Sequence, residues 1–261
     1  MLAALWRYRY FVMTSVVNDF RVRFSRSLLG GLWTILNPLA MVIIYAVVLS
    51  QVLKARIDGI SGDYAFAIYL TAGLLCWNLF SQIVSGALGL FIANANLIKK
   101  AAFPKVVLPT VLLGNNLVDS LALFVAMVLV YVVLGHTLAL PMLFAPLLLV
   151  LVAGFAVGIG LFVGVLNVFI RDLSQLVPIV LQLGFWFTPI VYPANILPEH
   201  IQSLLAFNPL YHFVGLFHDV LVFSRLPDMQ SLLIACVLCM TSLTLGLVIF
   251  RRASADLSDV L

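Results

Sequence analysis

Three lysines lie close together in a short segment between two uncharged stretches of the chain. The segment is LIKKAAFPKVVLP, residues 97–109, and it contains Lys99, Lys100 and Lys105 together with two prolines. Ammonium groups donate hydrogen bonds to anionic oxygens, so these side chains could bind a phosphate-type group. They could equally be the ordinary positive charge of a loop on the cytoplasmic side of a membrane. The segment by itself leaves both interpretations open.

Four aromatic residues gather in a second segment, FWFTPIVYP at residues 185–193. They are Phe185, Trp186, Phe187 and Tyr192. Aromatic side chains often anchor a helix at the membrane surface, and their faces can also stack on carbohydrate rings along a permeation path. Successive residues of a helix point about 100° apart, so the first three cannot all face one path. We expect one or two of the four to line it.

Three polar residues interrupt another apolar run. Asp119 is the only acid well inside such a run, and Asn115 and Asn116 precede it by about one helical turn. An ionisable residue inside a membrane span is a functional candidate by default. Amides and carboxylates can also join neighbouring helices by hydrogen bonds. The sequence favours this structural role without deciding it.

Catalytic, nucleotide and metal chemistry lack the residue patterns that they need. The phosphate-binding pattern GxxxxGK[ST] does not occur, because no lysine follows a glycine. His200, His212 and His218 are spaced by twelve and six residues, which matches no zinc pattern. Cys236 and Cys239 have no other cysteine or histidine nearby in the sequence. We therefore expect no catalytic residue, no metal and no cofactor in this chain.

The composition indicates whether the chain folds in water or in a lipid membrane. Of the 261 residues, 64% are hydrophobic and 9% are charged, whereas soluble domains carry about 25% charged residues. So much apolar surface requires lipid, and the sequence predicts an all-α integral membrane protein. The net charge of +4 then belongs to loops beside the membrane, and we expect no nucleic-acid partner.

The apolar runs predict one transmembrane domain over residues 1–261. An N-terminal amphipathic helix, residues 1–26, should lie along the membrane surface. The second run is longer than a span needs and should tilt or break near Asn94 and Asn96. The six predicted spans are 27–53, 64–96, 106–135, 144–170, 173–193 and 229–250.

Residues 194–228 differ from both a span and a solvated loop. Asn208-Pro209 divides this apolar segment, because the residue before a proline disfavours helix. The halves, 198–207 and 210–224, are each shorter than the ~20 residues that a crossing helix needs. We expect a re-entrant helical hairpin that enters and leaves the membrane on one side.

The basic residues predict the orientation. Cytoplasmic segments carry an excess of lysine and arginine. With both termini in the cytoplasm, eleven of the fourteen basic residues lie inside, and only Lys54, Arg56 and Arg225 lie outside. The same orientation places the hairpin outside and residues 97–105 at the cytoplasmic face.

Four stretches, in their order and spacing, resemble the ATP-binding-cassette permeases that export polysaccharides. They are RFSRSLLGGLWTILNPL at 23–39, the lysine segment at 97–109, FIRDLSQLVPIVLQLGFWFTPIVYP at 169–193 and FNPLYHF at 207–213. The resemblance covers nearly the whole chain and is closest to O-antigen permeases, while capsule and teichoic-acid permeases share the outline. It implies export of lipid-linked polysaccharide across the bacterial inner membrane. A stand-alone secondary flippase is the alternative.

The resemblance also implies partners and site residues. The permease would pair with a second copy of itself, bind two copies of a separate ATPase that holds ATP and Mg, and contact membrane lipids. Its cargo would be a polysaccharide carried on a polyprenyl pyrophosphate. Leu97–Pro104 would form a gate helix at the cytoplasmic mouth. The gate and pyrophosphate residues would be Lys99, Lys100, Phe103, Pro104 and Lys105, and the ATPase interface would include Arg21, Arg23, Arg26, Arg171 and Asp172.

Overall fold

The computed structural model describes residues 6–24, 33–44, 64–99, 104–136, 139–254 and 257. Every regular element in these ranges is a helix, which confirms the all-α class for the described part of the chain. In order they are α2 (Arg9–Phe24), α3 (Trp33–Ile44), α5 (Ala65–Ala93), α6 (Ala95–Ile98), α7 (Val107–Val133), the 3-10 helix η3 (Leu140–Phe144), α8 (Ala145–Phe169), α9 (Leu173–Trp186), the 3-10 helix η4 (Ala194–Ile196), α10 (Glu199–Leu205), α11 (Pro209–Leu221) and α12 (Met229–Ala253).

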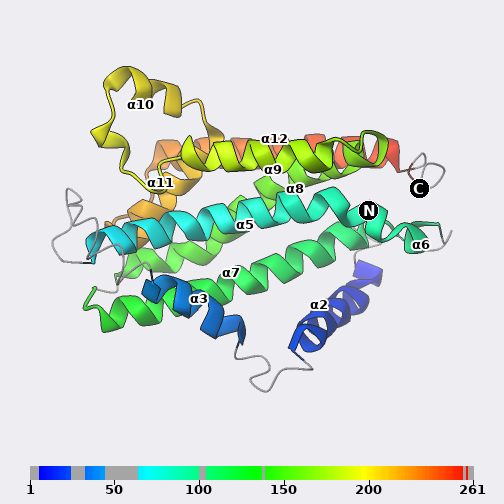
Figure 1. Ribbon diagram of the computed structural model, residues 1–261, viewed down its shortest axis with the longest axis horizontal. Helices are drawn as coiled ribbons and strands as arrows, with labels where there is room; N and C mark the ends of the chain where they lie inside the picture. The colour runs from blue at the N-terminus through cyan, green and yellow to red at the C-terminus, as the bar shows by residue number, and fades with distance from the viewer. Residues whose placement is uncertain are drawn as a thin grey trace.

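Within the described ranges, four helical stretches are long and apolar enough to cross a membrane. They are α5, α7, η3 continued by α8, and α12, which run alongside one another in Figure 1. Their positions correspond to the predicted spans 64–96, 106–135, 144–170 and 229–250. The chain is therefore a multi-pass membrane protein.

The two other predicted spans have a different status. The range 27–53 contains α3, but all of its other residues lie outside the described part of the chain. The range 173–193 contains α9, a helix of 14 residues, which is shorter than the ~20 residues of a complete crossing. The count of six spans stays a prediction.

Glycines let α8 approach two neighbouring helices at backbone distance. A Cβ atom on Gly246 of α12 would lie 2.3 Å from the carbonyl oxygen of Gly158. On another face of α8, a Cβ atom on Gly164 would lie 2.5 Å from the carbonyl oxygen of Ala87 in α5. In lipid, close packing of small residues is a main source of helix association. These contacts make α8 the helix on which α5 and α12 assemble.

A buried apolar cluster joins the ends of five helices at one end of the bundle. The rings of Phe91 in α5 and Phe250 in α12 stack there with centroids 5.6 Å apart. The full cluster is Phe91, Ile98, Leu108, Leu161, Val165, Val168, Phe250 and Leu257. We call this the lysine end of the bundle, because the segment with Lys99 and Lys105 begins and ends beside it. In Figure 1 it is the end where α6 and the red end of α12 lie.

The predicted break in the second apolar run is confirmed. Helix α5 ends at Ala93, Asn94 forms a turn, and α6 follows as a separate helical turn. The Asn94 side chain donates a hydrogen bond from Nδ2 to the carbonyl oxygen of Leu90 at 2.8 Å. An amide that bonds its own backbone competes with helix continuation, which explains why the chain turns here into the lysine segment.

Candidate functional site

The described lysines of residues 97–109 have different surroundings. Lys99 is exposed at the end of α6, whereas Lys105 is half-buried and donates a hydrogen bond from Nζ to the carbonyl oxygen of Ser254. Ser254 follows the last turn of α12, where a cation interacts favourably with the helix dipole. Lys105 thus joins the start of α7 to the end of α12. Lys100 and Phe103 lie outside the described residues, and Pro104 is half-buried just before α7.

Helix α2 is seated on α7. Asn115 donates from Nδ2 to Oδ2 of Asp19 at 2.7 Å. Gly114, the residue before Asn115, lies against Val16 of α2. A Cβ atom on Gly114 would lie 2.8 Å from Val16 Cγ2, so Val16 occupies the space that a side chain at position 114 would need. Arg21 of α2 is exposed. The predicted interface helix is therefore attached to a membrane-spanning helix at one defined position.

The predicted ATPase-interface residues are described to different extents. Arg23 belongs to α2, but its side chain, like all of Arg26, lies outside what the structure describes. Arg171 and Asp172 are both exposed on the short turn between α8 and α9. The carbonyl oxygen of Arg171 accepts from Ser174 Oγ at 2.7 Å. This turn follows Val168, so it lies at the lysine end of the bundle.

The three intramembrane polar residues are not equivalent. Asn115 bonds to α2, whereas Asn116 is buried and donates from Nδ2 to the carbonyl oxygen of Leu112 at 2.8 Å. Asp119 is half-buried one turn further along α7. Asn115 thus takes part in a contact between helices, and the hydrogen bond of Asn116 stays within its own helix.

The aromatic end of α9 has one ring packed against α5 and two exposed rings. The ring of Phe185 meets Trp77 of α5 edge-on, with centroids 5.6 Å apart. The side chains of Trp186 and Phe187 are 59% and 64% exposed. Trp186 and Phe187 are therefore the two rings of this trio that a cargo, a lipid or another protein chain can reach.

Tyr192 closes the turn that follows α9. It is half-buried, and its hydroxyl donates to the carbonyl oxygen of Trp186 at 2.8 Å. The hydroxyl of Tyr69 in α5 lies 3.1 Å from the carbonyl oxygen of Pro189 and 3.3 Å from that of Tyr192. Sequence analysis missed Tyr69, and the only available signal was that a tyrosine in an apolar run needs a hydrogen-bond partner.

The split at Asn208-Pro209 is confirmed, since α10 ends at Leu205 and α11 begins at Pro209. In Figure 1, α10 stands away from the long helices. Helix α11 packs against α5, α8 and α12 and has nine buried residues. Asn208 Oδ1 accepts from the backbone N–H of Leu210 at 3.0 Å and so caps α11.

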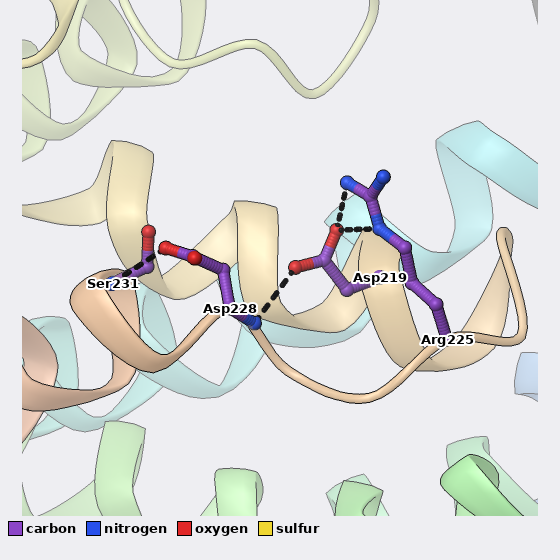
Figure 2. Close-up of polar contacts among 4 residues, drawn as sticks. All are labelled: Asp219, Arg225, Asp228 and Ser231. Atoms are coloured by element: carbon purple, nitrogen blue, oxygen red, sulfur yellow. Dashed lines mark hydrogen bonds and ion pairs between the residues drawn. The ribbon is translucent and has the colours of Figure 1, made fainter.

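An ion pair organises the exit from α11. Asp219 Oδ1 accepts hydrogen bonds from the Arg225 guanidinium at 2.5 and 2.9 Å, and its Oδ2 accepts from the backbone N–H of Asp228 at 3.2 Å (Figure 2). Asp228 in turn caps α12 by accepting from the Ser231 N–H at 2.8 Å. The hydrogen bonds from Ser231 lower the pKa of Asp228, so the cap is present at neutral pH and is lost as pH falls through that lowered pKa.

The histidines and acids of residues 199–219 are dispersed. His212 Nε2 lies 3.2 Å from the carbonyl oxygen of Ala206, and His218 Nε2 lies 3.1 Å from that of Tyr69. Over the described ranges, no three His, Cys, Asp or Glu side chains lie close enough together to hold a metal ion. Asp219 serves the turn before α12.

Comparison with known proteins gives one family match and several full-length relatives. The model of the family described as ABC-2 type transporter matches residues 10–222. An O-antigen export system permease protein RfbA of Klebsiella pneumoniae is 29% identical over 97% of this chain and 96% of its own length. A protein of the same name from Myxococcus xanthus is 26% identical over 99% and 98%. A polysialic acid transport protein KpsM of Escherichia coli is 25% identical over 90% of each chain.

Proposed function

The chain belongs to the ABC-2 type transporter family, and on that premise we propose that it is the membrane-spanning permease subunit of an ATP-driven exporter of lipid-linked polysaccharide. The observation that carries the proposal is the near full-length similarity to permeases named for O-antigen export. A polymer needs a long lined path rather than one enclosed pocket. The exposed rings of Trp186 and Phe187 are suited to stacking against sugar rings along such a path.

The O-antigen class is the first candidate for the cargo, and a capsular polysaccharide is the second. The relative named for polysialic acid transport supports the second, since it aligns with 90% of this chain. Its identity of 25% compares with 29% for the O-antigen permease of Klebsiella pneumoniae. We therefore place the O-antigen type first.

A second copy of the chain completes the path along α9. Val177 is the only buried residue of this helix, while Gln175 and Gln182 are exposed seven positions apart. Amide side chains are costly to leave in lipid without partners. A facing copy, with the cargo between the two, would supply those partners. This arrangement gives α9, although shorter than a full span, a protein and cargo environment instead of a lipid one.

The energy source is a separate ATPase, bound in two copies at the lysine end of the bundle. The exposed pair Arg171 and Asp172 and the exposed Arg21 of α2 offer charged contacts there. This end then faces the cytoplasm of a bacterium, with both termini on that side and six spans in all. The segments α10 and α11 form the re-entrant hairpin at the opposite face of the inner membrane.

The test is complementation of a deletion strain of the natural host. Without this chain, lipid-linked polysaccharide should accumulate on the cytoplasmic side, and surface polysaccharide should return when the chain and its ATPase are supplied together. The purified complex should hydrolyse ATP faster when lipid-linked glycan is added. Export that persists without any ATPase would contradict the proposal and favour a secondary flippase.

A further inference from the structure

We propose that Tyr69 and Asn208 are positioning residues for the aromatic end of α9, because together they fasten the turn at residues 187–192 to α5 and α11. We call this turn the exit turn. The inference rests on the proposed function for what the exit turn does, namely to close or shape the far end of the export path. The fastening itself rests on hydrogen bonds and packing alone.

Asn208 holds the exit turn from α11. Its Nδ2 donates to the carbonyl oxygen of Phe187 at 3.1 Å and to Oγ1 of Thr188 at 2.9 Å. The other side of the same amide caps α11 through Leu210. One side chain therefore uses both its donors on the exit turn and its acceptor on α11, which joins the start of α11 to the end of α9.

Tyr69 holds the exit turn from α5. Its hydroxyl lies within hydrogen-bond distance of two carbonyl oxygens of the turn, those of Pro189 and Tyr192. Between these two residues, Ile190 is fully buried. It packs directly on α5, since a Cβ atom on Gly73 would lie 3.1 Å from Ile190 Cγ2. The turn therefore packs closely on α5 at Gly73 and is bonded to α5 through the Tyr69 hydroxyl.

Helix α11 also contacts Tyr69 directly, through His218. The ring of His218 stacks on the Tyr69 ring with centroids 3.8 Å apart, and His218 Nε2 lies 3.1 Å from the Tyr69 carbonyl oxygen. Both attachments of the exit turn therefore lead to α11, directly through Asn208 and indirectly through Tyr69. The aromatic end of α9 and α11 should accordingly move as one unit when the far end of the path opens.

Reactivity of a cysteine at the buried position 190 reports whether the turn is fastened. The experiment uses the full chain in lipid nanodiscs, where both faces are accessible, with Ile190→Cys and with Cys76, Cys236 and Cys239 replaced by alanine. The probe is a charged maleimide. Loss of one ordinary hydrogen bond shifts an opening equilibrium by about fivefold. Tyr69→Phe should raise the labelling rate by about that factor, and Asn208→Ser, which removes two donors to the turn, by at least that factor.

The control variants separate fastening from general loosening. Tyr131→Phe removes a buried phenol hydroxyl that bonds to α5 at Ile68, the residue before Tyr69, and not to the exit turn. It should leave the rate unchanged. Serine at position 208 retains the cap of α11, so the effect of Asn208→Ser belongs to the lost donors. Thr188→Val, a milder change that removes one acceptor, should raise the rate in the same direction. Rates equal to the parent in both main variants, or an equal rise with Tyr131→Phe, would overturn the inference.

A functional measurement distinguishes this inference from the proposed function. In an exporting strain, Tyr69→Phe should increase the leak of small solutes through the resting transporter, and it should add little to the leak of Tyr192→Ala, because both act on the same turn. If Tyr69→Phe and Asn208→Ser raise the labelling rate but the parent protein exports no polysaccharide, the proposed function is refuted and the fastening stands. If the parent protein exports polysaccharide but the two variants label at the parent rate, only the fastening is refuted.

Discussion

Asn115 of α7 donates a 2.7 Å hydrogen bond to the carboxylate of Asp19 in α2, across 96 positions of sequence. Beside it, Gly114 provides the space that Val16 fills. The two contacts place the interface helix on the first half of α7, directly after the segment that contains the lysines. Under the proposed function, an ATPase that displaced α2 would act on α7 and, through Lys105, on the end of α12.

The first prediction concerns this attachment. Asp19→Ala and Asn115→Ala should each weaken ATP-driven export while membrane insertion and expression stay normal, since the bond connects two helices that both form without it. A double-mutant cycle on thermal stability should give a coupling of about 0.5–1.5 kcal/mol. Gly114→Val should have the larger effect, because its side chain displaces Val16. If the stability losses of the two single mutants add in the double mutant and export stays normal, the bond does not couple α2 to export.

The second prediction concerns the turn between α8 and α9. Arg171→Ala combined with Asp172→Ala should weaken binding of the partner ATPase by about fivefold or more, equivalent to about 1 kcal/mol. Both side chains are exposed and bury no apolar surface, so the fold should be unaffected. The matched control is Arg251→Ala with Arg252→Ala, which removes exposed charge at the same end. Co-purification measures the loss, and unchanged ATPase recovery in the first double mutant would exclude this turn from the interface.

The third prediction concerns the side of the membrane on which residues 194–228 emerge. Cysteines at Asn195 and Leu226, both exposed positions, should react with an impermeant maleimide added outside intact cells. The native cysteines are replaced by alanine for this measurement. A cysteine at Arg251 should react only after the cells are opened. If either hairpin position reacted only from the cytoplasm, the segment would cross the membrane and the count of six spans would be wrong.

The fourth prediction concerns the four aromatic residues. Trp186→Ala and Phe187→Ala should lower polymer export at unchanged stability, because these rings are exposed. Phe185→Ala should mainly cost stability, because this ring packs against Trp77. Tyr192→Ala should lower export or open a leak, and Tyr192→Phe should be milder, at about 1 kcal/mol for the lost bond to Trp186. Surface polysaccharide and small-solute leak are the measurements, and normal values in all four alanine variants would leave only an interfacial belt.

The fifth prediction concerns the contact of α8 with α12. A Cβ atom on Gly158 would lie 2.3 Å from the backbone carbon of Ser242, so Gly158→Ala should force the helices apart and cost about 1–3 kcal/mol. The control is Gly89→Ala in α5, where nothing lies within 4 Å. There the lost backbone freedom should stabilise the protein by about 0.5–1 kcal/mol. Thermal unfolding in detergent compares the two, and equal midpoints would contradict the close contact.

Several features follow from the sequence alone because they depend on local chemistry. Hydropathy gives the four long helices, since a segment buried in lipid must satisfy its own backbone hydrogen bonds. The break at Asn94 and the division at Asn208-Pro209 come from side chains and rings that act on their own backbone. The exposed Arg171-Asp172 turn follows equally, as two charges between uncharged runs.

The tertiary structure decided the partners of the polar side chains. The sequence leaves Lys105 either as a donor to a pyrophosphate or as ordinary cytoplasmic charge. In the structure it bonds to Ser254, 149 positions away, and only the tertiary structure identifies that partner. Asn115 could have bonded any neighbouring helix, and Tyr69 gave no sign that it would reach residues 189 and 192. A hydropathy profile follows the order of residues along the chain. It indicates that a polar group in lipid needs a hydrogen-bond partner but not which residue that partner is. Which partner it finds depends on how close the helices come, and here glycines such as Gly114 and Gly158 set that distance.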